Sequence, residues 1–271
     1  MRALAFVAPV LLLCSACGQK VDHSEPAPAC DPGVMKCFYG SPPTSTGNNP
    51  GTGNAAGATG TDEEVATLTG EVVVLGQDTF DPGVVLTSTA QVSATGSSGA
   101  RVMAAYDGKS FQLEGALKDA ANWFLVVPDS KSGMVPTIMP VDTRATTTVS
   151  VGVIDSLVLD TIFLNLNTER STERAQVVLR VVDGQNRSVV GVHASASPEV
   201  LAYRTAGVWL RDNSGTELAT DDSGMILLGN LQAGSALSPL AVALSGAATA
   251  RIDVVVEAGA TTLVTAVVAA K

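Results

Sequence analysis

Apolar and polar residues alternate in short runs from residue 65 onward, and this pattern predicts β-strands. In one run Phe111 and Leu113 point to one face and Gln112 and Glu114 to the other, as in a strand with one buried and one wet face. Turn sequences such as Asp107-Gly108 separate the runs. Regular short strands with such turns are typical of a sandwich. The runs that predict short strands are Gly70–Val74, Ala90–Thr95, Ser110–Glu114, Trp123–Val127 and Thr147–Val151.

A motif of the first half recurs in the second. The pattern Asp107-x-x-x-Phe-x-Leu-x-Gly-x-Leu117 returns as Asp221-x-x-x-Met-x-Leu-x-Gly-x-Leu231, at an offset of 114 residues. Solenoid repeats are shorter, about 20–50 residues, so a repeat of this length indicates duplication of a domain. We therefore expect an all-β protein with two tandem antiparallel β-sandwich domains, at 65–165 and 174–271, joined by the polar residues 165–174.

The second half resembles the carboxypeptidase regulatory-like domains, which are transthyretin-like, Ig-like sandwiches. The residues that carry the resemblance are a first strand ending in Asp183-Gly184, the hairpin Asp221-Asp-Ser-Gly224, Leu228-Gly-Asn-Leu-Gln-Ala-Gly234 and Ala258-Gly-Ala-Thr-Thr262. An insertion at 195–219 departs from the pattern. The resemblance implies an antiparallel sandwich without catalytic machinery of its own. In the motif, glycine is expected at positive φ at Gly229 and Gly234, and Leu231 is expected to plug the end of the sandwich.

Residues 18–60 show almost no apolar periodicity. The run is rich in Gly, Asn, Thr, Ser and Pro, which bury too little surface to order themselves. We expect residues 17–64 to form a disordered, flexible linker with a root-mean-square reach of roughly 35–40 Å.

The first residues predict export. Arg2 precedes the apolar run Ala3–Leu13, which is shorter than the ~20 residues of a spanning helix and is typical of a secretion signal. Ser15-Ala16-Cys17 resembles the lipobox of bacterial lipoproteins, which implies a signal peptide at 1–16 and acylation of Cys17, with Cys14 as the alternative. Gly18 after the cysteine favours the outer membrane by the same resemblance. An ordinary cleaved signal with incidental cysteines is the other interpretation.

Cys30 and Cys37 flank the turn sequence Asp31-Pro32-Gly33. In an oxidising envelope compartment the leading interpretation is a disulfide, which would constrain only a local loop. The alternative is a metal or redox site to which His23 adds a ligand.

Composition narrows the function classes. The formal net charge of −10 and the lack of a basic patch argue against nucleic acid. The two histidines are His23 and His193, and the sequence shows no nucleophile elbow, zinc-protease motif or phosphate loop. A hydrolase that uses a carboxylate pair stays open as an alternative, as does calcium at the turn residues Asp183, Asp212, Asp221 and Asp222. We expect no cofactor and no enzyme activity.

Aromatic side chains are the best candidates for recognition. Trp123 and Phe124 are expected to straddle a sheet, with one ring on each face. Tyr203 and Trp209 lie in the insertion, where an exposed ring would contact a partner; the alternative is a ring folded onto its own sheet. The sequence thus predicts a non-catalytic, lipid-anchored envelope protein that binds or scaffolds an envelope protein or a glycan. The alternative is a carbohydrate- or ligand-binding accessory lipoprotein of a surface export or adhesion system.

Overall fold

Runs rich in Val, Thr and Ala form the strands of this chain, and turns at Gly, Asn and Asp separate them. The computed structural model describes residues 64–269 apart from 78, 97–100, 120, 214–217 and 235. Cys14, Cys17, Cys30, Cys37 and His23 lie outside the described residues, so the signal, lipid and disulfide predictions stay predictions. Each strand predicted from the alternation lies within or overlaps an observed one.

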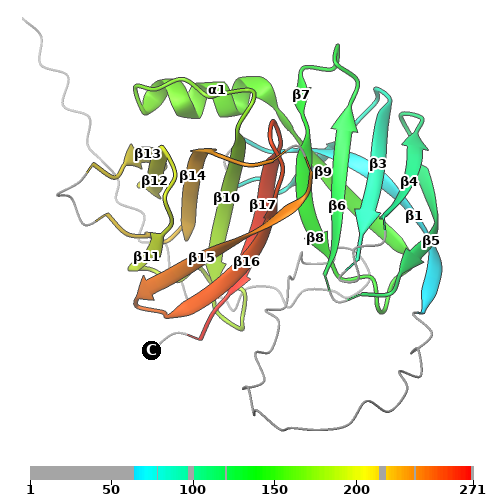
Figure 1. Cartoon of the computed structure of the whole chain (residues 1–271). Coiled ribbons are helices and arrows are strands. Elements are labelled where there is room, and N and C mark those ends of the chain that lie inside the picture. The colour runs from blue at the N-terminus through cyan, green and yellow to red at the C-terminus, as the bar shows by residue number, and fades with distance from the viewer. Residues whose placement is uncertain are drawn as a thin grey trace, which may run out of the picture. The chain divides into compact units, whose positions relative to one another are not determined.

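The described chain is mostly strand, with one α-helix (Figure 1). The expectation of an all-β fold is confirmed. The elements of the first half are β1 (Val65–Leu75), β2 (Pro82–Val85), β3 (Ala90–Thr95), β4 (Arg101–Tyr106), β5 (Phe111–Leu117), β6 (Asn122–Pro128), β7 (Met134–Val135), β8 (Thr137–Val141), β9 (Thr148–Asp155) and α1 (Ser156–Asn165). Those of the second half are β10 (Ala175–Val182), β11 (Val192–Ser195), β12 (Val200–Thr205), β13 (Val208–Arg211), β14 (Met225–Leu231), β15 (Ser238–Gly246), β16 (Ala250–Val256) and β17 (Thr261–Val267).

The strands form three sheets. A five-stranded sheet has the order β2-β1-β9-β7, with β5 also paired to β1. A nine-stranded sheet has the order β13-β12-β14-β10-β17-β8-β6-β3-β4, and a three-stranded sheet has the order β11-β15-β16. The nine-stranded sheet takes strands from both halves, because β17 pairs with β8 at Thr261–Thr137 and Thr262–Ile138.

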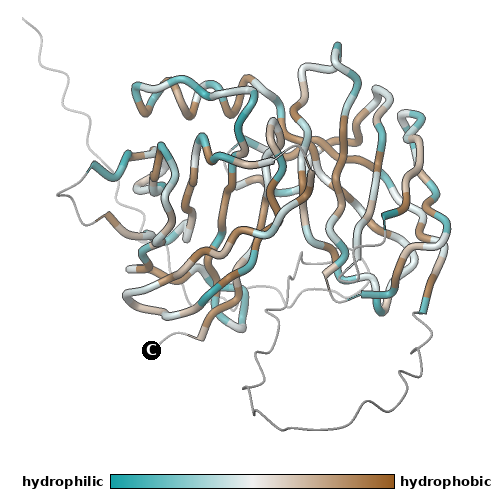
Figure 2. Tube along the Cα trace, viewed as in Figure 1, coloured by the Kyte–Doolittle hydropathy of each residue, from teal (hydrophilic) through white to brown (hydrophobic). Residues whose placement is uncertain are grey.

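Each half encloses a core of its own. In the first half, Leu68, Leu113, Phe124 and Val151 are fully buried members of one cluster, which fills the space between the five-stranded sheet and β3, β6 and β8. In the second half a separate cluster joins β10, β14 and β17 to β11, β15 and β16. Figure 2 shows hydrophobic residues along these strands and hydrophilic residues at many of the turns.

The two halves share a pairing pattern. The repeated motif occupies β5 and β14, and each of these strands pairs antiparallel with the first strand of its half, β1 or β10. Each first strand in turn pairs in parallel with the last strand, β9 or β17. This common topology supports a duplication, while the exact boundaries at 65–165 and 174–271 stay a prediction.

Three strand pairs depart from the antiparallel arrangement that we expected. β1 with β9, β10 with β17, and β17 with β8 are parallel. Alternation along a strand predicts which face is buried, but it contains no information on the direction of the neighbouring strand. The sheets are therefore mixed.

Helix α1 lies at the junction of the halves and was not predicted. Asp155 caps it, with its carboxylate accepting a hydrogen bond from the Leu157 N–H at 2.9 Å. Leu159, Ile162 and Phe163 are buried, whereas Leu157 and Leu164 are 69% and 73% exposed. Apolar residues therefore occur on every side of α1, which removes the amphipathic period that identifies a surface helix.

A third core surrounds the buried face of α1. It combines side chains from the first half, from α1 and from the second half. The halves are therefore joined by a continuous apolar cluster as well as by the nine-stranded sheet. The members of this cluster include Val73, Leu75, Val135, Ile154, Leu159, Ile162, Phe163, Val178, Trp209 and Leu227.

In the described part of the chain, no helix is long and apolar enough to span a bilayer.

Candidate binding surface

The insertion of the second half folds into the hairpin β12–β13, which ends the nine-stranded sheet. Ala206 and Gly207 link the two strands with φ values of 51° and 83°. Positive φ at both turn residues matches the right-handed twist of a two-residue hairpin. Asp221 holds this turn from outside, because its Oδ2 accepts a hydrogen bond from the Ala206 N–H at 2.7 Å.

Asp221 also organises the turn that precedes β14. Its Oδ1 accepts hydrogen bonds from the N–H and the hydroxyl of Ser223, at 2.9 and 2.7 Å. Partial burial alone would raise the pKa of Asp221, but the hydrogen bonds from Ser223 and Ala206 outweigh it and hold the pKa below its ordinary value. The carboxylate thus fastens the β12–β13 turn to the turn that precedes β14 by charge-assisted bonds.

Tyr203 and Trp209 occupy opposite faces of the hairpin. Tyr203 is 1% exposed and belongs to the core of the second sandwich. Its hydroxyl oxygen accepts a hydrogen bond from the Ala194 N–H at 2.9 Å, and burial raises the pKa of the phenol. The Tyr203 ring therefore lies on its own sheet, as in the alternative considered above. Trp209 is 9% exposed and packs into the junction core beside α1.

A cavity of about 480 Å³ lies beside β13. Trp209, Leu210 and Arg211 line it from the strand, and residues 165–167 line it from the segment that follows α1. Amide groups, an indole and a guanidinium thus share one recess. Its described lining residues are Asn165, Leu166, Asn167, Trp209, Leu210, Arg211, Asn213 and Leu218.

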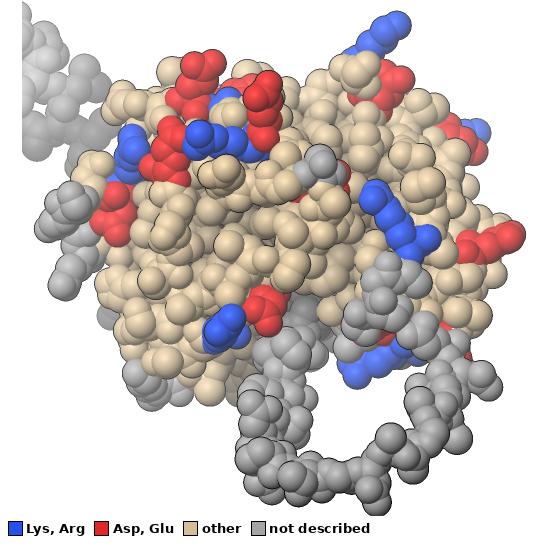
Figure 3. Space-filling model, viewed as in Figure 1, with Lys and Arg blue, Asp and Glu red and all other residues tan. Residues whose placement is uncertain are grey.

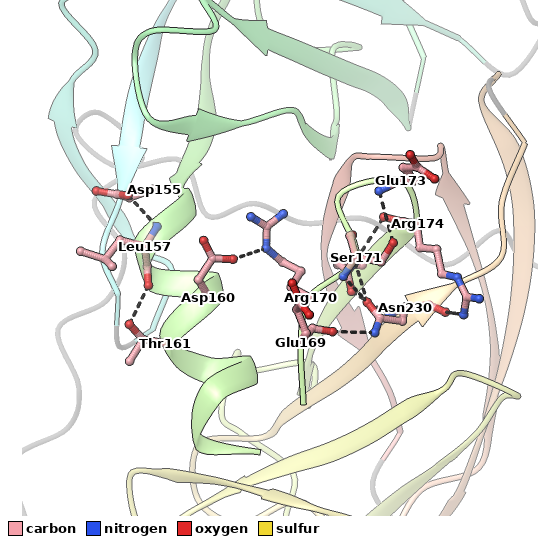
Figure 4. Close-up of polar contacts among 11 residues, drawn as sticks. Asp155, Leu157, Asp160, Thr161, Glu169, Arg170, Ser171, Glu173, Arg174 and Asn230 are labelled. Atoms are coloured by element: carbon pink, nitrogen blue, oxygen red, sulfur yellow. Dashed lines mark hydrogen bonds and ion pairs between the residues drawn. The ribbon is translucent and has the colours of Figure 1, made fainter. Parts of the chain in front are cut away.

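The segment after α1 is fixed by polar contacts, which are shown in Figure 4. Arg170, whose side chain is largely buried, donates from Nε to Asp160 of α1 at 2.7 Å. Asn230 of β14 accepts a hydrogen bond from the Ser171 N–H at 2.9 Å and donates to the Glu169 carbonyl at 3.0 Å. The cavity wall at 165–167 therefore belongs to a segment tied to both α1 and β14.

Charged side chains gather over one part of the surface. Figure 3 shows acidic and basic residues together at the upper left, where Figure 1 places α1, while much of the rest of this face is uncharged. In this part of the chain Asp160 pairs with Arg170, and Glu199 pairs with Arg174 at 2.6 Å. The Arg174–Glu199 pair is exposed on both sides and contributes little stability, whereas the Arg170 side chain is largely buried and helps to position the segment.

Two of the turn aspartates considered for calcium, Asp183 and Asp221, cap their own turns. Asp183 accepts hydrogen bonds from the Gln185 and Arg187 N–H groups and from the Arg187 guanidinium. The Arg187 guanidinium is the main cause that lowers the pKa of Asp183. Within residues 64–269, gaps aside, no group of three or more His, Cys, Asp or Glu side chains is arranged to hold a metal ion.

His193 lies on β11 with its Nδ1 2.9 Å from the Leu218 carbonyl oxygen. The contact joins β11 to the strand-free stretch before Asp221. The structure does not bring His193 together with Tyr203 and Trp209 in one recess, since the cavity lining includes neither Tyr203 nor His193.

Trp123 and Phe124 straddle β6 as predicted. Phe124 is fully buried in the core of the first sandwich and makes a tilted contact with Phe111, with ring centroids 6.5 Å apart. Trp123 is partly buried on the other face, against Leu125 and Ile138. Trp123 thus supports the junction of the halves.

Sequence reasoning missed the cavity wall and the residue that fixes it. Asn167 and Asn230 have φ values of 52° and 55°. Asparagine tolerates this left-handed conformation better than other residues with a Cβ, so the two asparagines are the signal that the sequence offered. The prediction that Gly229 and Gly234 have positive φ was wrong. Neither glycine has a positive φ, and Asn230 between them does.

Comparisons with known proteins give no family. No protein-family model matches the sequence, and no curated protein matches it. Solved structures align over parts of the chain. The streptococcal ancillary pilin shares 12% identity over 75% of this chain and 69% of its own, with a TM-score of 0.24. The Bacillus anthracis TIE protein shares 11% identity over 75% of this chain, with a TM-score of 0.21, and the aligned part is 34% of its length. A candidate cell adhesion protein from Bacteroides eggerthii shares 11% identity over 76% of this chain and 88% of its own, with a TM-score of 0.22.

Proposed function

We propose that this chain is a non-catalytic, lipid-anchored protein of the cell envelope that acts by binding or scaffolding through its β-sandwiches. The observation that carries the binding role is the cavity beside β13. The side chains that line it include Trp209, Arg211 and three asparagines. Amides and a guanidinium recognise polar groups by hydrogen bonds, and an indole offers a flat apolar surface.

The anchoring role is supported by the sequence before the first strand. Ser15-Ala16-Cys17 resembles a lipobox, and the Gly- and Ser-rich residues that follow suit a linker that holds the sandwiches away from lipid headgroups. A two- or three-chain anchor is effectively permanent, whereas one chain binds only marginally. We propose Cys17 as the anchored residue and the outer membrane as the location.

Fractionation of cells that express the full chain tests the anchor. The wild-type protein is expected in the membrane fraction, released by detergent and not by high salt. Cys17→Ala is expected to move it to the soluble envelope fraction. Cys14→Ala is the matched control and is expected to stay with the membrane. If the Cys14→Ala protein were released and the Cys17→Ala protein stayed with the membrane, the anchored residue would be Cys14 and the proposal for Cys17 would be wrong.

A second candidate function is that of a glycan-binding accessory lipoprotein of a surface export or adhesion system. Its support is the combination of Trp209 with the amides of Asn165 and Asn167 in one recess. In a Trp123→Phe background Trp209 is the remaining tryptophan, so saturable quenching of its fluorescence by a glycan reports binding at the cavity. No change across a broad glycan panel would count against this candidate.

A further inference from the structure

Among the described residues, no strand pairs with the outer edge of β13. β13 is the last strand of the nine-stranded sheet and pairs with β12 on one side. Thr205 and Val208 flank the two-residue turn, and the Asp212 N–H donates to the Leu201 carbonyl at 2.8 Å. These contacts set the alternation of the antiparallel ladder. Val208, Leu210 and Asp212 therefore direct their N–H and C=O groups to β12.

Trp209 and Arg211 direct theirs the opposite way. In the described part of the chain, no backbone hydrogen bond reaches the N–H or C=O of either residue. An edge of this kind is a template for another strand, and stable proteins usually cover or charge it. Both residues also line the cavity of about 480 Å³. Residues 165–167 line the same cavity, and we name the space between them and β13 the slot.

The side chains of β13 extend the slot on both faces. Val208 and Leu210 are 56% and 41% exposed and lie on the face opposite Trp209. Trp209 and Arg211 lie on the face that packs towards α1. A segment that paired with β13 would therefore meet apolar side chains on one face, and an indole and a guanidinium on the other.

The positive charge of Arg211 favours a negatively charged ligand in the space beside β13. Arg211 is the charged residue among the described residues that line the cavity, and no carboxylate lines it with Arg211. One guanidinium nitrogen of Arg211 donates to the Glu199 carbonyl at 3.1 Å. A guanidinium has five N–H donors, so it has donors left for a carboxylate. This is a local exception in a chain of net charge −10.

We propose that β13 accepts an extended peptide segment of a partner protein as an added antiparallel or parallel strand, with a carboxylate side chain of that segment bound to Arg211. The main chain of the peptide bonds to the N–H and C=O of Trp209 and Arg211, as in other cases of strand addition. The proposal rests on the binding role given above and names its ligand class. It does not depend on acylation of Cys17.

The test uses the full chain and fluorescein-labelled peptides of alternating Thr and Val with a central Glu, Gln or Lys. Fluorescence anisotropy is expected to show saturable binding of the Glu peptide. Binding of the Gln peptide is expected to be at least about tenfold weaker, because a charge-assisted bond is lost. The Lys peptide is expected not to bind. Absence of binding by all three peptides would overturn the proposal.

Two substitutions of Arg211 distinguish the contribution of its backbone N–H to peptide binding from that of its guanidinium charge. Arg211→Pro removes the outward N–H, which β12 does not use, and proline is tolerated at such edge positions. It is expected to abolish binding. Arg211→Ala keeps the N–H and is expected to bind the Glu and Gln peptides equally and weakly. Arg251→Ala removes an exposed arginine of β16 and is the matched control, with binding unchanged. Equal affinity of Arg211→Pro and wild type for the Glu peptide would overturn the proposal.

Hydrogen exchange gives a measurement that needs no variant. Addition of the Glu peptide is expected to slow exchange of the Trp209 and Arg211 amides and to leave that of Val208 and Leu210, which already pair with β12, unchanged. A dimer that forms with rising concentration and is lost in Arg211→Pro would overturn the peptide proposal and assign the edge to a second copy. Because none of these measurements involves a membrane, their failure leaves the anchoring of Cys17 to its own test.

Discussion

Asn230 and Gln176 hold each other across the paired strands β14 and β10. The Asn230 N–H donates to Gln176 Oε1 at 2.8 Å, and Gln176 Nε2 donates back to Asn230 Oδ1 at 3.4 Å. Both side chains are buried. Through its remaining bonds to Ser171 and Glu169, Asn230 ties the segment after α1 to the second sandwich. The cavity wall depends on this relationship.

Asn230→Ala is expected to lower the free energy of unfolding by about 2–4 kcal/mol. The substitution leaves buried donors and acceptors without partners and keeps a positive φ that alanine tolerates poorly. Urea unfolding measures the change. Asn167→Ala, at a similar φ but exposed, isolates the backbone contribution and is expected to cost less. Equal losses for the two variants would show that the buried network contributes nothing.

Gly229 makes room for Phe163. A Cβ on Gly229 would lie 2.7 Å from Phe163 Cζ and 3.1 Å from Val200 Cβ. Gly229→Ala is therefore expected to destabilise the protein by about 1–3 kcal/mol through overpacking. Gly234→Ala, where a Cβ meets no atom within 4 Å, is expected to be near neutral. Thermal melting of the two variants compares them, and a neutral Gly229→Ala would contradict the packing of α1 on β14.

Leu231 is buried in the core of the second sandwich, as the motif predicted. Leu231→Asp is expected to cost more than about 4 kcal/mol, because it buries an unpaired charge. Leu164→Asp on the exposed face of α1 is the control and is expected to stay within about 0.5 kcal/mol of wild type. The yield of secreted protein and the melting temperature are measured for both variants. Unaltered secretion and melting of Leu231→Asp would exclude the assigned position.

Asp221 makes stability depend on acid pH. Its folded pKa is lowered, so the stabilisation that it contributes is fully present above its unfolded pKa of about 3.9 and is lost as the pH falls through the folded pKa. Urea midpoints measured from pH 7 down to pH 2 are expected to fall below about pH 4. In Asp221→Asn this acid-dependent loss is expected to be smaller, and the variant is expected to be less stable than wild type at pH 7. If the urea midpoints of wild type and Asp221→Asn changed with pH in the same way, the Asp221 carboxylate would not contribute to stability.

The sequence predicted which side chains are buried better than it predicted the relative direction of paired strands or contacts between residues far apart in the chain. Alternation placed Phe124 and Trp123 on opposite faces of β6, and the repeated motif placed Leu231 in a core. Both inferences depend on the local period of the strand. The parallel pairing of β1 with β9 depends on residues about eighty positions apart, which no local pattern encodes.

The candidate site was harder to predict for the same reason. The sequence pointed to Tyr203 and Trp209, but it gave no sign of which ring the sandwich would bury. The cavity wall depends on Asn230, whose partners Ser171 and Gln176 lie 59 and 54 residues away. Helix α1 was missed because exposed Leu157 and Leu164 hide its buried face.

Intact-mass spectrometry of the mature protein, purified from membranes in detergent, tests the central claim most directly. The account predicts a chain that begins at Cys17 and has the added mass of a diacylglyceryl group, with or without a third acyl chain. A mature chain with an unmodified Cys17 would contradict the account, because the sandwiches would then have no lipid that holds them at the envelope.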